Sequence, residues 1–132
     1  MNQKGFATLE VILMIVVIGI LATVAVPRFT DMTAKANTAK IQSDLATLDN
    51  AIAIYYMEKG KYPEGDDISV LQDYVKDVDK LTPPKGKAYI VGETEAKTVG
   101  TEYKIAQPTG ETEKRATLDG YTSGSFALPK NN

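Results

Sequence analysis

The sequence predicts an α+β protein: a long N-terminal α-helix, membrane-spanning in its first half, packed against a small C-terminal antiparallel β-sheet head. Three observations on the 132 residues support this prediction. Residues 6–27 are almost wholly apolar, residues 28–60 place apolar side chains at helical spacing, and residues 61–132 contain short apolar segments separated by glycines and prolines. We therefore expect a hydrophobic helix, its amphipathic continuation and a globular head, in that order.

The apolar segment is long enough to cross a bilayer as a helix. From Val11 to Val26 it contains no charged residue, and Thr23 is its only hydroxyl-bearing side chain. Extended back to Phe6 it comprises 21 residues, and about 20 helical residues span a hydrocarbon core of about 30 Å. The sequence therefore predicts a single membrane span joined to a domain of ordinary soluble composition.

Three interpretations of this segment compete. A secretory signal peptide needs a cleavage site of small residues, and Thr23-Val24-Ala25 matches that pattern poorly. A plain membrane anchor explains the length but not Glu10, because a charge near the bilayer centre costs at least about 2.5 kcal/mol, and less near an interface. The third interpretation depends on the residues that immediately precede the apolar segment.

The second half of the helix is predicted from an amphipathic pattern that runs to about Glu58 and ends at Gly60. The apolar side chains recur at the 4-3-4-3 spacing of a narrow helical seam. They are Ala34, Ile41, Leu45, Leu48, Ile52 and Tyr55. Thr38 is a mild interruption of this seam, and the charged residues beside it, Asp44 and Asp49 among them, are expected in water. A helix of this length in so small a chain favours packing against other copies.

The head is predicted to contain one short helix and three or four strands. Pro63 breaks the long helix, and Asp66 or Asp67 is suited to cap a short helix over residues 68–79. Glycines separate the strands that follow. These strands are expected at residues 87–91, 101–107, 115–118 and 125–128. The antiparallel sheet that they form is expected to cover the apolar seam of the long helix.

The composition argues against catalysis. The chain has no His and no Cys, which excludes the Ser-His-Asp and Cys-His nucleophile systems, the common zinc sites and disulfides. Its net charge of −2 does not support nucleic-acid binding, although one basic patch is conceivable on the sheet: Lys85, Lys87, Lys114 and Arg115. One acidic cluster matches no EF-hand loop: Asp66, Asp67, Asp73, Asp77 and Asp79. We therefore expect no enzyme activity, no cofactor and no metal site.

The first ten residues carry a more specific pattern. Residues 4–10 read KGFATLE and lead directly into the apolar segment. This pattern resembles the class III signal peptide of type IV prepilins and pseudopilins, in which a short basic leader ends in Gly, Phe follows, and Glu lies four residues further on. Gly5, Phe6 and Glu10 fill these places. Ala7 departs mildly, since hydroxyl-bearing residues are common there, and residues 1–5 form a minimal leader with one basic side chain.

Two deeper positions also match, so that the resemblance covers residues 4–60 and is only architectural beyond them. Gly19 and Pro27 stand where many pilins carry a helix-weakening Gly and Pro. Gly costs a helix about 1 kcal/mol relative to Ala, and Pro removes a hydrogen bond and clashes with the preceding turn. The resemblance implies that residues 19–27 loosen when subunits pack. The alternative is an ordinary membrane helix with a Pro at its exit.

The resemblance also implies a maturation and an assembly step. A prepilin peptidase on the cytoplasmic side would cut between Gly5 and Phe6 and methylate the new amine of Phe6. Glu10 would then pair with the Phe6 amine of a neighbouring subunit and set the register of assembly, because a carboxylate in hydrocarbon needs a hydrogen-bond donor or a cation. The alternative is a Glu at the membrane edge whose carboxylate reaches the headgroups.

The function that follows is structural. We expect a subunit that polymerises by helix packing into an extracellular filament serving adhesion, motility, DNA uptake or secretion. Its partners would be copies of itself, the prepilin peptidase and the assembly machinery of the inner membrane. The precursor would lie in the cytoplasmic membrane with its head outside, before export to a cell-surface filament.

Two alternatives remain: a pseudopilin of the type II secretion kind, and a membrane-anchored binding domain that does not polymerise. Pseudopilins of type II secretion typically carry an acidic calcium loop near the C-terminus. This chain offers only Asp119 there, which favours a pilus subunit. The absence of a C-terminal cysteine pair also separates its head from the usual Gram-negative pilin head.

Overall fold

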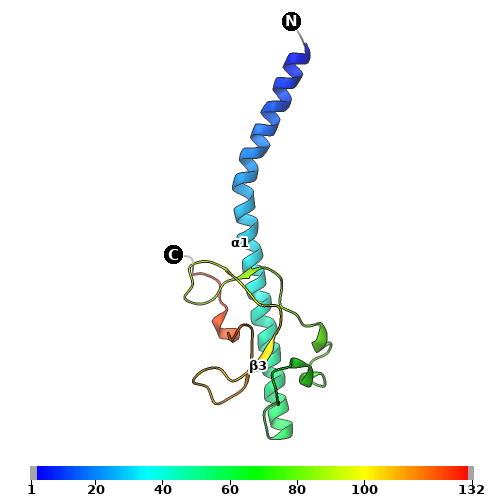
Figure 1. The fold of residues 1–132 in the computed structure, drawn as a ribbon, viewed down its shortest axis with the longest axis vertical. Coiled ribbons are helices and arrows are strands. Elements are labelled where there is room, and N and C mark those ends of the chain that lie inside the picture. Colours follow the sequence, from blue (N-terminus) through cyan, green and yellow to red (C-terminus); the bar gives the residue numbers. More distant parts are fainter. Residues whose placement is uncertain (1–2, 131–132) are drawn as a thin grey trace. The chain divides into compact units, whose positions relative to one another are not determined.

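The computed structural model describes residues 3–130. The chain consists of two compact units, one up to Met32 and one from Thr33 onward. The main element of both is helix α1, Gln3–Lys59 (Figure 1). The predicted long N-terminal helix is thus confirmed. α1 is helical on both sides of Pro27. The predicted loosening of residues 19–27 applies to subunits packed in a filament, so it stays a prediction.

α1 ends where the sequence predicts. Gly60 follows its last residue with φ +71° and donates its N–H to the Tyr56 carbonyl at 2.8 Å. A side chain disfavours this left-handed conformation, which is why glycine so often ends a helix. Lys59 in the last turn faces the negative end of the helix dipole.

The predicted helix over residues 68–79 is wrong. Two short 3₁₀ turns stand there instead, η1 (Ile68–Leu71) and η2 (Val78–Lys80). The Asp67 carboxylate caps η1 by accepting the Ser69 N–H at 2.8 Å, which agrees with one of the two predicted caps. Asp77 has φ +56° immediately before η2, and a residue in the left-handed region cannot continue a right-handed helix.

The strands of the described chain are shorter than predicted and form two separate sheets. β1 (Lys87–Ala88) pairs antiparallel with β2 (Lys97–Thr98), and β3 (Lys104–Ala106) pairs antiparallel with β4 (Arg115–Thr117). The antiparallel pairing is confirmed, whereas the single sheet of three or four strands is wrong. Sequence analysis missed β2, and the strand expected at 125–128 is reduced to one bridge, Ile90↔Phe126.

The core of the head lies where the second half of α1 meets the segments after Gly60. Its fully or almost fully buried side chains come from both: Ile41, Leu45, Leu48, Ile52, Leu71, Val78, Ile105, Leu118 and Phe126. Four of the six residues of the predicted seam are among them, namely Ile41, Leu45, Leu48 and Ile52. Burying each such side chain stabilises the fold by about 1.5–3 kcal/mol. Tyr55, the last residue of the predicted seam, is only partly buried and makes an edge contact with Tyr74.

Candidate assembly site

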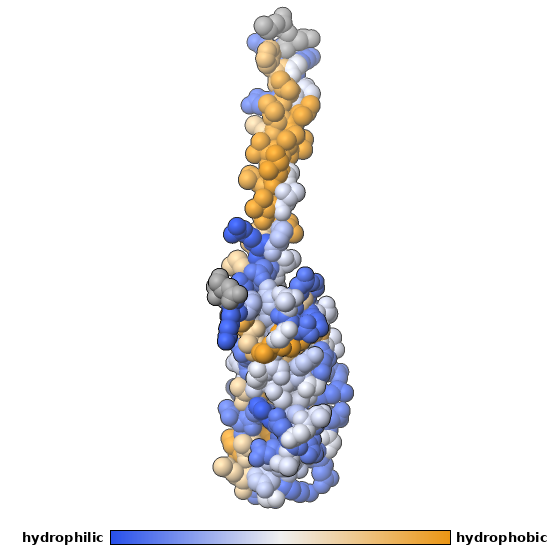
Figure 2. Space-filling view, turned by 90° about the vertical axis from the view of Figure 1, so that its left-hand side faces the viewer, coloured by the Kyte–Doolittle hydropathy of each residue, from blue (hydrophilic) through white to orange (hydrophobic). Residues whose placement is uncertain are grey.

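The N-terminal part of α1 exposes its apolar side chains on all sides. From Phe6 to Met32, the large hydrophobic residues are 51–68% exposed, and Figure 2 shows that the hydrophobic colour predominates in the middle of this segment, with white and blue side chains among it. By length and composition, α1 is able to cross a membrane. A helix that is apolar on every face needs lipid or other helices around it, so these residues form a contact surface for one or both.

Gly5, Phe6 and Glu10 all lie in the first turns of α1 and are exposed. Phe6 and Glu10 are four residues apart and therefore share one face of the helix. A Cβ at Gly5 would have no neighbouring atom within 4 Å, so the backbone there is open to approach. Among residues 3–130, the Glu10 carboxylate has neither an ion pair nor a hydrogen bond. The proposed site residues are thus accessible to an external partner.

Gly19 and Pro27 lie in the exposed part of α1. A Cβ at Gly19 would also have no neighbour within 4 Å, so no close contact within the chain requires glycine there. Two threonine hydroxyls near Pro27 donate to backbone carbonyls: Thr23 to Ile20 at 2.7 Å and Thr30 to Pro27 at 2.8 Å. Such bonds slightly destabilise and often bend helices. These hydrogen bonds lie in or next to the segment between Gly19 and Pro27 that is predicted to loosen.

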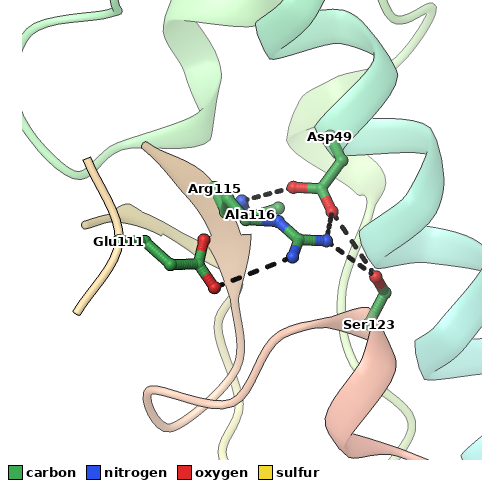
Figure 3. Close-up of polar contacts among 5 residues, drawn as sticks. All are labelled: Asp49, Glu111, Arg115, Ala116 and Ser123. Atoms are coloured by element: carbon green, nitrogen blue, oxygen red, sulfur yellow. Dashed lines mark hydrogen bonds and ion pairs between the residues drawn. The ribbon is translucent and has the colours of Figure 1, made fainter. Parts of the chain in front are cut away.

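Asp49, which was expected in water, is the centre of a polar cluster (Figure 3). Its carboxylate accepts the Ala116 N–H and an Arg115 guanidinium N–H, both at 2.8 Å, and the Ser123 hydroxyl at 3.5 Å. On the other side of the guanidinium, Glu111 Oε1 lies 3.9 Å from Arg115 Nη1. The hydrogen bond that the Arg115 guanidinium donates to Asp49 raises the pKa of Arg115 above its ordinary value. The hydrogen bonds of this cluster hold β4 against α1.

Asp44 is the second acidic residue whose predicted exposure is wrong. It accepts the Tyr103 hydroxyl at 2.6 Å and pairs with Lys40 at 2.5 Å. Tyr103 is almost fully buried, and burial, together with the hydrogen bond to Asp44, raises the pKa of its phenol.

Thr38, which was expected to interrupt the seam mildly, is fully buried within it. Its hydroxyl donates to the Ala34 carbonyl at 2.7 Å and accepts the Tyr89 N–H at 2.8 Å. Asn37 beside it donates to the carbonyls of Lys85 and Lys87 at 3.3 and 3.0 Å. One turn further on, Gln42 donates to the Phe126 carbonyl.

A heptad count would have placed four of these polar side chains beside the apolar seam, without identifying the groups that they contact. Asn37 and Asp44 are seven residues apart on one flank of the apolar seam, and Gln42 and Asp49 are seven apart on the other flank. Residues at this spacing lie on one helical stripe. Polar side chains on both flanks of the seam thus form hydrogen bonds to the segments that cover it.

The four basic residues considered for nucleic-acid binding do not converge. Lys85 and Lys87 lie beside Asn37, whereas Arg115 is bound to Asp49, which is twelve residues and so about 18 Å further along α1. Lys114 donates to the Pro63 carbonyl at 2.7 Å. The four side chains therefore do not form one basic patch in this head.

The carboxylates of the head are likewise dispersed. Within residues 3–130, no group of three Asp or Glu side chains is placed to hold a metal ion. Asp119 accepts the Gly100 N–H at 2.7 Å and fills the space that a Cβ at Gly100 would occupy. It thus serves as a turn-stabilising residue in this head.

Comparison with known proteins finds relatives of two named kinds. Type II secretion system core protein G of Vibrio cholerae serotype O1 is 31% identical over 128 residues, which cover 94% of this chain and 82% of that protein. The corresponding protein of Dickeya chrysanthemi is 27% identical over 97% of this chain and 81% of its own length. Type IV narrow pilus major component PilA5 of Thermus thermophilus is 40% identical over 68 residues, 52% of this chain and 59% of that protein.

Other alignments are shorter. That with core protein G of Klebsiella pneumoniae covers 47% of this chain and 44% of the relative, so the chain matches less than half the length of several relatives. No protein-family model matches the chain, and no solved structure matches it. The near full-length relative, together with the long apolar N-terminal helix followed by small antiparallel sheets, shows that the chain belongs to the type IV pilin and pseudopilin family.

Proposed function

We propose that this chain is a structural subunit that polymerises through the apolar part of α1 into a filament outside the cytoplasmic membrane. The observation that carries the proposal is the exposure of that segment, 51–68% for its large apolar side chains from Phe6 to Met32. In the precursor, lipid covers this apolar surface. In a filament, the apolar helices of neighbouring subunits cover it. The head buries its own apolar seam and needs no such cover.

Maturation by a prepilin peptidase is the second part of the proposal. The enzyme cuts after Gly5 and methylates the new amine of Phe6, which leaves a positive charge one helical turn from Glu10. The open surroundings of Gly5 and the absence of a partner for Glu10 among residues 3–130 support this proposal. The Glu10 carboxylate of one subunit pairs with the Phe6 amine of its neighbour, so that a misplaced subunit leaves a costly unpaired charge in the apolar bundle.

A secretion pseudopilus is a second candidate for the filament. It is favoured by the near full-length alignments, because both of these relatives are named as type II secretion system core protein G. The pilus interpretation is favoured by the named narrow-pilus component of Thermus thermophilus. In both cases the precursor lies in the cytoplasmic membrane with its head outside, and the inner-membrane machinery assembles it with copies of itself.

Intact mass and N-terminal sequencing of the protein from its native cells test the maturation step. The expected chain begins at Phe6 and carries one added methyl group. A chain that begins at Met1 indicates a plain anchor, and one that begins at Val26 indicates a secreted domain; either result contradicts the proposal. Electron microscopy of the same cells then distinguishes a long surface filament from a short periplasm-spanning one.

A further inference from the structure

The charged side chains of the head are unevenly distributed along α1. Three segments, 33–44, 85–99 and 126–130, contain six basic and three acidic residues, which give a net side-chain charge of +3. The other segments of the head, 45–84 and 100–125, contain seven basic and twelve acidic residues, which give a net side-chain charge of −5. We call the first three segments the basic end. Its basic residues are Lys35, Lys40, Lys85, Lys87, Lys97 and Lys130.

Hydrogen bonds within the head bring the segments of the basic end together. The Asn37 side chain donates to the carbonyls of Lys85 and Lys87 at 3.3 and 3.0 Å, and the Gln42 side chain donates to the Phe126 carbonyl. β2 pairs with β1 and is thereby held at the same place. The basic end therefore surrounds the beginning of the head's helix, where the chain arrives from the apolar segment.

Lys85 and Lys87 are the cations of the basic end that the head leaves accessible. Both are exposed, and neither side chain forms an ion pair or a hydrogen bond within residues 3–130. Their backbone is nevertheless fixed, because Asn37 holds both carbonyls and Gly86 between them has φ +115°, which glycine adopts readily. Two ammonium groups on a fixed segment are thus available to an external anion.

The acidic residues of the basic end do not neutralise these two lysines. Asp44 pairs with Lys40 and Glu93 pairs with Lys97, both at 2.5 Å. The third acidic residue, Glu95, is exposed between β1 and β2. An extended anionic surface therefore attracts the basic end and repels the rest of the head, so that it orients the head.

We propose that the basic end rests on anionic phospholipid headgroups of the cytoplasmic membrane before the subunit assembles. This proposal rests on the membrane-spanning precursor proposed above, and it adds a lipid contact of the head to that of the apolar helix. Contact through the basic end holds the acidic part of the head away from the membrane.

Continuity with the apolar segment favours lipid as the occupant. Asn37 follows Pro27 by ten residues, which span about 15 Å as a helix. The headgroup layer extends about 5–7 Å beyond the hydrocarbon core, and charges act over a further Debye length of about 8–10 Å. Lys85 and Lys87, which are held beside Asn37, are therefore within electrostatic reach of the headgroups.

The expected attraction is modest. One lysine near an anionic surface is expected to favour the lipid-bound position of the head about fivefold. Two lysines are thus sufficient to orient the head, while the contact stays reversible and allows the subunit to leave the membrane for a filament.

Energy transfer in reconstituted vesicles tests this contact on the full chain. A donor dye is attached to Thr98→Cys, which is opposite Lys87 in the β1–β2 pair and supplies the chain's single thiol, because the natural chain has no cysteine. The acceptor is a dye on a small fraction of the lipid headgroups. The vesicles contain phosphatidylcholine alone, or one phosphatidylglycerol for every two phosphatidylcholines.

Transfer is expected to be higher in the anionic vesicles than in the neutral ones. Raising the salt concentration from about 0.1 to about 1 M is expected to remove the difference, because the Debye length falls from about 10 to about 3 Å. In Lys85→Gln/Lys87→Gln, the transfer in anionic vesicles is expected to fall to the level in neutral vesicles. Folding is expected to persist, since Asn37 binds the backbone carbonyls of these residues, and circular dichroism checks it.

The matched control is Lys76→Gln/Lys80→Gln, which removes two exposed lysines from the other part of the head and changes the net charge equally. It is expected to keep the wild-type transfer. If the first double variant does not fold, the single variants Lys85→Gln and Lys87→Gln replace it. Each is expected to lower the ratio of lipid-bound to free heads about fivefold.

The outcomes separate the two proposals. Equal transfer in both kinds of vesicle, or an equal loss in the Lys76→Gln/Lys80→Gln control, overturns the lipid contact and leaves the proposed polymerisation intact. A salt-sensitive transfer that appears only with many subunits per vesicle indicates contact with another copy and likewise overturns it. If the full chain does not float with the vesicles after detergent removal, the membrane-spanning precursor and the lipid contact fail together.

Discussion

At the scale of single residues, the carboxylates of this chain lie in two different environments. Asp44 and Asp49 are held by several donors of the head, whereas Glu10 has no partner among residues 3–130 although it lies next to a wholly apolar segment. An ionised carboxylate tolerates an apolar environment only when a donor or a cation satisfies it. We therefore expect Glu10 to take its partner from outside residues 3–130.

Replacing Glu10 tests this role directly. In Glu10→Ala the leader is expected to be removed normally, while filament assembly is lost, because nothing holds the Phe6 amine of the neighbouring subunit. Intact mass measures cleavage, and electron microscopy with quantitative blotting of sheared filaments measures assembly. Thr8→Ala, two residues away on the same exposed turns, is the control and is expected to assemble normally. Filaments of Glu10→Ala at wild-type abundance would contradict the proposed pairing.

At the scale of secondary-structure elements, the head is held to α1 by side chains more than by strand pairing. β1 to β4 have two or three residues each, which is too little for a self-sufficient sheet. Asn37, Thr38 and Asp49 on α1 instead bind backbone groups of the segments 85–89 and 115–116. The loops thus take their positions from polar residues on the flanks of the helix.

The stability of β4 on α1 is expected to depend on Asp49. In Asp49→Ala the Ala116 N–H and the half-buried Arg115 guanidinium lose their acceptor, which is expected to lower the free energy of unfolding by about 1.5–3 kcal/mol. Urea unfolding of the detergent-solubilised protein, followed by tyrosine circular dichroism, measures this change. Asp79→Ala removes an exposed carboxylate of the same head and is expected to change the free energy of unfolding by less than about 0.5 kcal/mol. If both variants change the free energy of unfolding equally, Asp49 does not hold β4 against α1 in the way described.

At the scale of the whole molecule, the two units have opposite solvent preferences. The apolar N-terminal part of α1 needs lipid or neighbouring helices, whereas the part from Thr33 onward folds around its own core. The stability of the head is consequently a property of the single subunit, and its dependence on pH follows from groups buried in that head.

Alkaline pH is expected to destabilise the head through Tyr103. Burial and the hydrogen bond to Asp44 raise its pKa in the folded state, and contact with Glu58 raises the pKa of Tyr74 to about 12. Above pH 10 the unfolded chain loses these phenolic protons while the folded chain keeps them, so the free energy of unfolding falls as the pH rises. For one proton the slope approaches about 1.4 kcal/mol per pH unit at most.

The variant Tyr103→Phe isolates this contribution. It is expected to be less stable than the wild type below pH 10 and to lose less stability between pH 10 and 12. Urea unfolding at several pH values measures the two slopes. Tyr121→Phe, a change at the head surface, is the control and is expected to keep the wild-type slope. Parallel curves for wild type and Tyr103→Phe would show that Tyr103 does not carry the alkaline loss.

Features that depend on local pattern can be predicted from the amino-acid sequence alone. Continuous apolarity over residues 6–27 and the 4-3-4-3 seam predicted α1 and its buried face, because helical periodicity is a property of neighbouring residues. Gly60 marked the helix end for the same local reason. The leader pattern around Gly5 and Glu10 indicated the family through a resemblance confined to the first part of the chain.

The way in which the head is held against α1 depends on contacts that exist only in the folded chain. Whether Thr38 interrupts the seam or completes it depends on the Tyr89 N–H, which lies 51 residues further along the chain. The two separate sheets, the left-handed Asp77 and the inward role of Asp49 follow from contacts between distant segments, which no local pattern encodes. Such contacts are selected by the need to satisfy every buried polar group at once, and that condition is defined only in the folded head.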